Sequence, residues 1–327
     1  MSLILPEKAT QPTFYFIGVT TNESSIMNIF PKWAKEVLEI SNATIKGIDI
    51  EIRAKKDDYR DVVDFIKYDD LSLGALVTTH KLDLFEACED MFDYLDPHAL
   101  RLRELSCISK KDGQLLGHAK DPITSGLALE TFVPKGFWLK NSGDVFIMGA
   151  GGSALAISSY LAQIKFQDDI PSKIVITNRS IERLKEAERK LKGINDKVAF
   201  EFIQAITPED NDRLLSRVKA CSLIINATGL GKDRPGSPLS DNSSFPANSL
   251  VWELNYRGDL IFIDQAQKQK VEKNLHIEDG WNYFIHGWTQ VIAEVFDIDI
   301  DEDKFKKCEK FAMEMRQREA RTDALSC

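Results

Sequence analysis

The segment Gly149-Ala150-Gly151-Gly152-Ser153-Ala154 is the part of the sequence whose residue types most clearly serve a chemical purpose. It lies between an apolar run at 144–148, which predicts a buried strand, and an apolar pattern at 154–164, which predicts a helix. In that context Gly149 permits a tight turn, Gly151 lets the backbone approach a pyrophosphate, and Ala154 allows close packing of helix on strand. Free N–H groups at such a helix start bind anions, so we predict a dinucleotide site; a βα turn without a ligand is the alternative.

A second polar segment, Asn178-Arg179-Ser180-x-x-Arg183, follows the predicted strand at 173–177. An NAD site carries an acidic residue about twenty residues after its glycines, where it binds the ribose diol. Arg179 stands in this region instead, and its guanidinium offers a planar set of donors to a 2′-phosphate, while Arg183 can stack on the adenine or add charge. The pattern predicts NADP rather than NAD, unless both arginines are only solvated side chains.

Asn226, Ala227 and Thr228 end a predicted buried strand at 222–227 and are followed by two glycines. The ends of parallel strands line the ligand crevice of an open α/β sheet. We therefore expect Asn226 and Thr228 to contact the nicotinamide ribose. The alternative is that both residues only end the strand by bonding to their own backbone.

Lys81 and Asp121 are the candidates for proton transfer in the first half of the chain. Lys81 directly follows a predicted strand at 73–79, Asp121 follows the hairpin, and both positions are expected to face the boundary between domains. Oxidation of a secondary alcohol needs a group that takes the hydroxyl proton as hydride leaves, and a lysine beside an orienting carboxylate can do this. From spacing alone, two ordinary surface residues remain an alternative.

Predicted strands and helices alternate along both halves of the chain. The first half is expected to hold strands at 14–19, 44–53 and 73–79, helices at 29–40 and 62–68, and a hairpin of 106–109 with 114–117 through Asp112-Gly113. The second half is expected to hold strands at 144–148, 173–177, 199–202, 222–227 and 250–254 and helices at 154–164 and 181–191. From Asp301 on, the apolar positions of a charged helix fall on one face: Phe305, Cys308, Phe311 and Met315. This order predicts an α/β fold with parallel strands and a Rossmann-type second half.

Composition excludes several functional classes. A net charge of −9 over 327 residues argues against binding of nucleic acid or an anionic membrane. The five cysteines are odd in number and form no C-x-x-C pair, and no histidine has metal-ligand spacing, so we expect free thiols and no metal. The N-terminus does not resemble a signal peptide, and no apolar run approaches the roughly 18 residues of a membrane span. We expect a soluble, cytoplasmic protein with a small-molecule substrate, as a monomer or homodimer.

Together these motifs resemble the shikimate dehydrogenase family, from Gly18 to about Phe296. Further elements that carry the resemblance are Leu254-Asn255-Tyr256 and Asp279-Gly280-Trp281. The resemblance implies an N-terminal α/β substrate domain at 12–124, to which C-terminal helices at 284–327 return, and an NADP-binding Rossmann domain at 125–283. It also implies that Lys81 and Asp121 form the catalytic pair. The implied cofactor contacts are Gly149, Ala150, Gly151, Gly152, Ser153, Ala154, Asn178, Arg179, Ser180, Arg183, Asn226, Ala227, Thr228 and Gly280.

The departures from the family pattern concentrate where relatives hold shikimate. The family element Asn-Val-Thr-x-Pro-x-Lys is one residue shorter here and begins with Leu76. The family's Asn-Thr pair falls on Ser106-Cys107, its Asn-Thr-Asp on Ala119-Lys120-Asp121, and a glutamine near the C-terminus on Gly287. Ile26 replaces the second of two serines that bind the carboxylate, although Ser25 can take over. The residues expected to contact substrate are Ser24, Ser25, Thr78, Ser106, Tyr256 and His286.

Two hypotheses follow from the sequence. The first is an NADP-dependent dehydrogenase of aromatic amino acid biosynthesis that acts on shikimate or a related cyclic polyol acid, with Lys81 as proton acceptor and Asp121 orienting the lysine and the hydroxyl. The second is a non-catalytic sensor on the same fold, against which the retention of both Lys81 and Asp121 counts. Lys120 either contacts an anion or points to water, and the sequence leaves this open.

Overall fold

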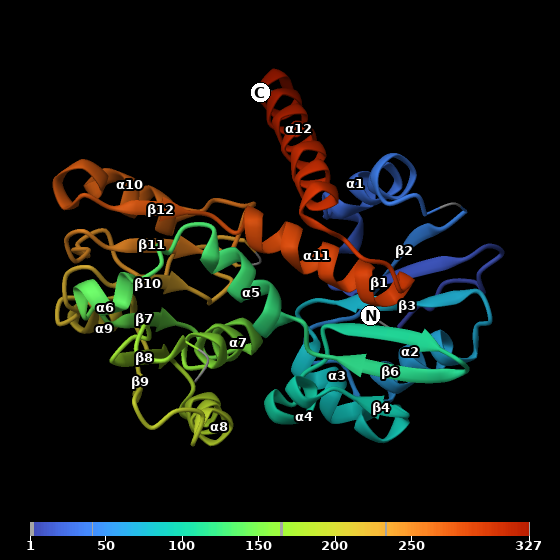
Figure 1. Cartoon of the computed structure of the whole chain (residues 1–327), viewed down its shortest axis with the longest axis horizontal. Coiled ribbons are helices and arrows are strands. Elements are labelled where there is room, and N and C mark those ends of the chain that lie inside the picture. Colours follow the sequence, from blue (N-terminus) through green and yellow to red (C-terminus); the bar gives the residue numbers. More distant parts are fainter. Residues whose placement is uncertain (1–2, 41, 164–165, 233, 327) are drawn as a thin grey trace. The chain divides into compact units, whose positions relative to one another are not determined.

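The computed structural model describes residues 3–40, 42–163, 166–232 and 234–326, with side chains up to residue 318 (Figure 1). It divides into two compact units: unit 1 contains Met1–Lys120 with Gly287–Cys327, and unit 2 contains Asp121–His286. Each unit is built on its own six-stranded sheet with helices packed against it. The predicted α/β fold class is confirmed.

Unit 1 contains a mixed sheet with the strand order β2-β1-β3-β5-β6-β4. Its strands are β1 (Thr13–Gly18), β2 (Thr44–Asp49), β3 (Ser72–Val77), β4 (Tyr94–Leu95), β5 (Cys107–Lys111) and β6 (Gln114–His118). β1 pairs in parallel with β2 and β3, whereas β5 is antiparallel to both β3 and β6. The predicted hairpin is present, and Asp112 and Gly113 at its turn have φ of 52° and 77°, as a type I′ turn requires.

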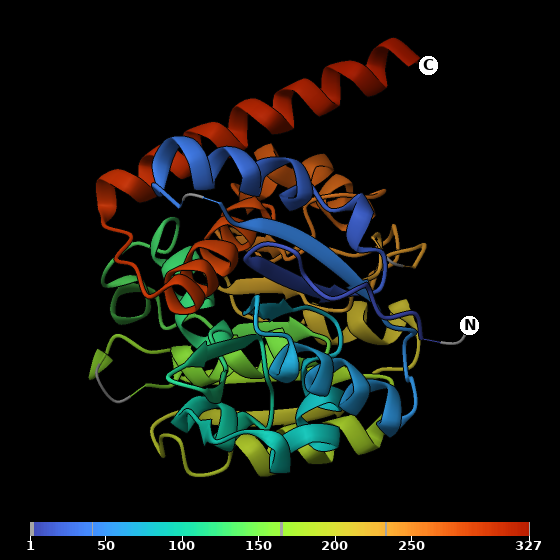
Figure 2. The same cartoon turned by 90° about the vertical axis from the view of Figure 1, so that its right-hand side faces the viewer.

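The helices of unit 1 come from both ends of the chain. They are η1 (Thr21–Glu23), α1 (Ile26–Lys32), the π-helix η2 (Trp33–Val37), α2 (Lys56–Tyr68), α3 (Lys81–Cys88), η3 (Glu89–Met91), α4 (Pro97–Leu102) and α12 (Glu302–Ser326). α12 runs beside α1 and η2 (Figure 2), and the indole N–H of Trp33 donates to the carbonyl of Cys308 at 2.9 Å. On the predicted apolar face of α12, Cys308 is buried and the other three positions are half-buried. α11 (Trp281–Phe296) passes from unit 2 into unit 1 at Gly287.

The strand β1 shows why the predicted strands of this chain are continuously apolar. All six of its residues, Thr13–Gly18, are buried. A central parallel strand is covered on both faces, so its sequence is continuously apolar instead of alternating. Tyr15 and Ile17 point into one core with the apolar face of α2, while Phe14 and Phe16 contact Trp288 on the opposite face.

Unit 2 contains a fully parallel sheet with the strand order β12-β11-β10-β7-β8-β9. Its strands are β7 (Val145–Met148), β8 (Lys173–Asn178), β9 (Ala199–Gln204), β10 (Leu223–Asn226), β11 (Leu250–Glu253) and β12 (His276–Glu278). Its helices are α5 (Asp121–Glu130), α6 (Phe137–Asn141), α7 (Gly152–Leu161), α8 (Ile181–Leu191), α9 (Pro208–Leu215) and α10 (Ile261–Lys273). The strand order reverses between β7 and β10, and ligands of such sheets bind at the carboxyl ends of the strands at this point.

Several predicted boundaries differ from the observed ones. The strand expected at 44–53 ends at Asp49, because a turn that closes on the carbonyl of Glu51 leads into α2. The helix expected at 154–164 begins at Gly152 and ends at Leu161, and position 164 lies outside the described residues. The helix expected at 29–40 is α1 followed by a π-helical turn, with Pro31 inside α1. Within the described ranges, no helix has the length and apolar character needed to cross a membrane.

Candidate nucleotide and catalytic site

The glycine turn of unit 2 begins at Gly149, directly after β7. Gly149 has φ of +114°, and a Cβ at this position would overlap the carbonyl group of Ala227, which follows β10. Its N–H donates to the carbonyl of Thr177 at 2.8 Å. Only glycine combines this backbone conformation with so close an approach of two strands. The predicted tight turn therefore lies at the strand-order reversal of the sheet.

The N-terminus of α7 projects from this turn. Gly151 is its N-cap and provides no side-chain cap, and a Cβ on Gly151 would meet no atom of the described residues within 4 Å. The N–H groups of the first helical turn, in Gly152, Ser153 and Ala154, are thus available to an anion at the positive end of a ten-residue helix. Ala154 is fully buried, as close packing of the helix on the sheet requires. This geometry fits a pyrophosphate.

Arg179 and Arg183 lie at the next strand end, between β8 and the start of α8. Ser180 is the N-cap of α8, since its hydroxyl accepts the N–H of Arg183 at 3.3 Å, and Asn178 in turn accepts the N–H of Ser180 at 2.9 Å. Both arginine side chains are exposed, and neither is paired with a carboxylate among the described residues. Glu182, in the same turn, bonds to the hydroxyl of Ser180. Two unpaired guanidinium groups are therefore available to a second anion.

Asn226 and Thr228 form a hydrogen-bonded turn at the end of β10. Asn226 is fully buried, and its Oδ1 accepts the N–H of Thr228 at 3.0 Å and the hydroxyl of Thr228 at 2.7 Å. The amide Nδ2 of Asn226 donates to the carboxylate of Glu253 at 2.6 Å. Burial raises the pKa of Glu253 to about 7 despite these donors. The side chain of Asn226 thus joins β10, its following loop and β11.

Gly280 brings the segment after β12 against the end of β11. A Cβ on Gly280 would overlap the carbonyl of Leu254, and its N–H donates to the carbonyl of Asn255 at 3.1 Å. Half-buried Tyr256 packs with ring centroids 5.2 Å from Trp281 and 4.6 Å from Phe284. Tyr256 therefore has an aromatic packing role whether or not its hydroxyl reaches a substrate.

Asp121 is connected to the glycine turn through a residue that the sequence analysis did not identify. Asp121 is buried at the start of α5, and the hydroxyl of Tyr283, on α11, lies 3.2 Å from its Oδ2. The same hydroxyl lies 3.5 Å from Oγ of Ser153, the second residue of α7. Tyr283 thus lies between the candidate catalytic carboxylate and the N-terminal turn of α7. The only feature of the sequence that could have indicated this role is that Tyr283 follows the Asp279-Gly280-Trp281 element by two residues.

Lys81, in unit 1, is the first residue of α3 and follows a strained loop. Thr79 has φ of +52°, a conformation that costs a β-branched residue about 1–3 kcal/mol. His80, the N-cap, is buried with its Nδ1 3.2 Å from the hydroxyl of Tyr59 on α2, and burial lowers its pKa. Thr78 donates both its N–H and its hydroxyl to the carbonyl of Ile17 on β1. Surrounding contacts therefore fix the backbone that carries Lys81.

The other residues expected to contact substrate have mixed environments. Ser24 is buried and Ser25 half-buried at the start of α1. Ser106 is buried, and its hydroxyl accepts the N–H of Lys120 at 2.7 Å. His286 is buried within α11, and desolvation lowers its pKa to about 4, so its imidazole is neutral at physiological pH.

Lys120, whose orientation the sequence left open, forms an ion pair inside unit 1. Its Nζ lies 2.5 Å from Oε2 of Glu294, on α11. His118 lies 3.4 Å from the other oxygen of Glu294 and 3.1 Å from the hydroxyl of Ser109. The ammonium group of Lys120 is thus neutralised within the protein. Among the described residues, no group of three or more His, Cys, Asp or Glu side chains is arranged to hold a metal ion.

Comparison with known proteins shows to which family the chain is related. No family model matches the chain. The chain is 30% identical over 215 residues to a shikimate dehydrogenase (NADP(+)) of Paramagnetospirillum magneticum. The aligned residues make up 65% of this chain and 69% of that protein. The chain belongs to the shikimate dehydrogenase family.

Other members of the family, and proteins of the same fold, resemble the chain more distantly. A shikimate dehydrogenase (NADP(+)) of Streptococcus thermophilus is 27% identical over 181 residues, which make up 55% of this chain and 59% of that relative. The alignment therefore spans little more than half of that relative's length. Quinate dehydrogenase from Corynebacterium glutamicum, solved in complex with NAD, has a TM-score of 0.69 at 16% identity, with 92% of this chain and 98% of that chain covered. The likeness to the solved structure shows a shared fold.

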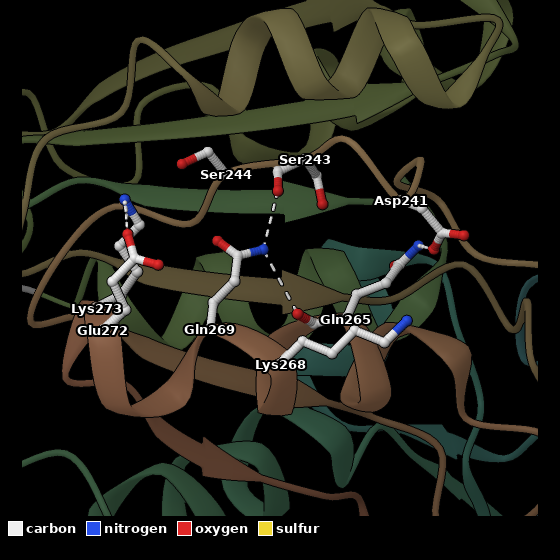
Figure 3. A pocket seen from close by; sticks show the side chains of 8 residues that line it. All are labelled: Asp241, Ser243, Ser244, Gln265, Lys268, Gln269, Glu272 and Lys273. Carbon is white, nitrogen blue, oxygen red and sulfur yellow. Dashed lines mark hydrogen bonds and ion pairs between the residues drawn. The ribbon is translucent and has the colours of Figure 1, made fainter.

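A pocket of about 310 Å³ lies elsewhere on unit 2 (Figure 3). It is lined by Asp241, Ser243, Ser244, Gln265, Lys268, Gln269, Glu272 and Lys273. The amide of Gln265 bonds to Asp241, and that of Gln269 bonds to the carbonyl of Ser243. The backbone carbonyl of Lys273, at this pocket, accepts the N–H of Asn248 just before β11, so the pocket lies toward the amino ends of the strands, opposite the glycine turn.

The two glycines of the turn are expected to respond differently to a methyl group. Gly149→Ala should lower the free energy of unfolding by at least about 2 kcal/mol, because the residue has positive φ and its Cβ would overlap Ala227. The matched variant Gly151→Ala should change it by no more than about 1 kcal/mol, since its Cβ enters open space and only the preference of the N-cap position for glycine over alanine is lost. Urea unfolding of both variants measures the difference, and equal destabilisation would contradict the described turn.

Proposed function

We propose that the chain is an NADP(H)-dependent oxidoreductase that moves a hydride between nicotinamide and a ring secondary alcohol or ketone of shikimate or a related cyclic polyol acid. The observation that carries this proposal is the N-terminus of α7, which follows the turn at Gly149 and has no side-chain cap. At the end of the next strand, Arg179 and Arg183 are exposed and form no ion pair among the described residues. Relatives named shikimate dehydrogenase (NADP(+)) support it. A role in aromatic amino acid biosynthesis, in the cytoplasm and as a monomer or homodimer, belongs to the same proposal.

The two parts of the chain take different tasks in this proposal. Residues 125–283 form the NADP-binding domain, and 12–124 with 284–327 form the substrate domain. The helix start at Gly152–Ala154 binds the pyrophosphate, Arg179 and Arg183 bind the 2′-phosphate and adenine, and the loop after Asn226 contacts the nicotinamide ribose.

The proposed chemistry needs a proton acceptor and a group that orients it. NADP⁺, when bound, supplies the hydride acceptor. Lys81 takes the hydroxyl proton as the C–H bond breaks, and Asp121 orients the lysine and the hydroxyl. The hydroxyl of Tyr283, 3.2 Å from Oδ2 of Asp121, helps to orient this carboxylate. His286, neutral because burial lowers its pKa to about 4, contributes no positive charge to the site.

The cofactor preference depends on Arg179. We expect native protein to bind NADP at least tenfold more tightly than NAD, about 1.4 kcal/mol, because a guanidinium meets the 2′-phosphate. Arg179→Asp should narrow or invert this ratio, whereas Arg217→Asp, a change to another exposed arginine of unit 2, should leave it unchanged. Calorimetry with both nucleotides measures the ratio, and equal affinities in native protein would refute the assignment.

Catalysis is expected to depend on Lys81. Lys81→Ala should lower turnover by roughly 100-fold or more while NADP affinity is nearly unchanged, because the lysine acts on the proton and lies in unit 1. Asp121→Asn should lower turnover similarly, and exposed Lys35→Ala serves as the control. Steady-state kinetics with any accepted substrate provides the test. Unaltered turnover in both variants would assign the pair a structural role, and NADP binding without turnover of any acid would favour a sensor.

The substrate is expected to be an acid with fewer or differently placed hydroxyls than shikimate. Leu76, Ser106, Cys107, Ala119 and Gly287 stand where the family pattern provides other polar side chains. A pocket that has lost donors discriminates against a ligand that needs them, but not against one without those hydroxyls. Kinetics over shikimate, quinate and their amino and deoxy analogues decides this. A kcat/KM for shikimate above that of every analogue would contradict it.

A further inference from the structure

Glu253, a buried carboxylate at the end of β11, connects three segments of unit 2. Its side chain is fully buried. Oε2 lies 2.6 Å from Nδ2 of Asn226, at the end of β10. Oε1 accepts the backbone N–H of Asn255 at 2.8 Å and Nδ2 of Asn255 at 2.6 Å. Three short hydrogen bonds therefore hold a charge that no solvent reaches.

The carboxylate determines how the amide of Asn226 is turned. An ionised carboxylate only accepts hydrogen bonds, so the amide must present its NH₂ group to Glu253 and its oxygen to the opposite side. There Oδ1 accepts the N–H and hydroxyl of Thr228, at 3.0 and 2.7 Å. The hydroxyl of Thr228 then accepts the N–H of Leu230 at 3.1 Å. A single chain of hydrogen bonds thus leads from Glu253 to Leu230.

Asn255 holds the same loop from its other side. Its Nδ2 donates to Glu253 and lies 3.2 Å from the carbonyl of Leu230. The loop 227–230 begins at Ala227, whose carbonyl lies against Gly149. Both ends of the Glu253 network therefore fix the loop that borders the glycine turn.

We propose that Glu253 is a positioning residue for the nucleotide, and that its carboxylate, acting through Asn226 and Asn255, holds the loop 227–230 in the conformation that binds the nicotinamide ribose. This inference rests on the proposed function. Glu253 itself is fully buried and would touch neither substrate nor cofactor.

The network makes nucleotide affinity depend on pH. Burial raises the pKa of Glu253 to about 7, and Asp279 adds like charge, while the donors from Asn226 and Asn255 favour the ionised form. Below this pH the carboxyl group of Glu253 is protonated. Its O–H then faces the amide N–H of Asn226, so two donors meet. If Asn226 turns to accept it, its NH₂ group faces the N–H of Thr228 and that hydrogen bond is lost. Affinity for NADP therefore falls as the pH falls through about 7.

The test compares the dissociation constant of NADP in native protein and in Glu253→Gln between pH 6 and 9. A glutamine presents only one acceptor oxygen, so one buried donor loses its partner. We expect roughly tenfold or more weaker binding at pH 8 and a flatter pH profile in the variant. The 2′-phosphate of NADP titrates in both proteins, so the difference between their profiles isolates Glu253. Glu201→Gln, at an exposed position on β9, should retain the native profile.

Hydrogen exchange in native protein provides a measurement that no folding defect of a variant can obscure. Protection of the amides of Thr228 and Leu230, corrected for intrinsic exchange, should decrease from pH 8 to pH 6. Unchanged protection, or identical affinity profiles in native and folded Glu253→Gln protein, would overturn the role of Glu253. Absence of NADP binding in native protein at every pH would instead refute the proposed function.

Discussion

In unit 2, Gly149 lies so close to the carbonyl of Ala227 that no side chain fits between them, and the arrangement of the neighbouring strand ends depends on this contact. β7 and β10 are neighbours in the sheet, and the chain leaves both strands at the same edge. A side chain at position 149 would separate them, and with them the start of α7 from the loop 227–230. The first turn of α7 is uncapped by any side chain, so the anion site that we propose there would consist of backbone N–H groups alone and depend on the geometry of this edge.

The polar groups at this edge connect the ends of β10 and β11 to the loop 227–230 through hydrogen bonds. A carboxylate buried at Glu253 loses its hydration, and the amides of Asn226 and Asn255 offset part of that loss. Apolar residues of similar size would fill the same space. The arrangement is therefore better explained by what it orients, the hydroxyl and N–H of Thr228, than by its contribution to stability.

The sequence predicted what is local in the chain and missed what depends on distant contacts. The strand, glycine turn and helix around Gly149 are adjacent in sequence, so their pattern was sufficient. Tyr283 lies 162 residues from Asp121, and no spacing predicts the contact between their side chains. Thr79 is an ordinary strand residue by propensity, yet in the structure it follows β3 with φ of +52°. The sequence analysis also missed α3 and α10. Apolar residues are not concentrated on one side of either helix, so the helical period is weak in both sequences.

Hydrogen exchange measured with and without NADP tests whether the glycine turn and its neighbouring strand ends bind this nucleotide. We predict that NADP slows exchange in three segments: the first turn of α7 at 151–155, the start of α8 at 179–183 and the loop 227–230. Protection confined to other parts of the chain, such as the pocket along α10, would contradict it.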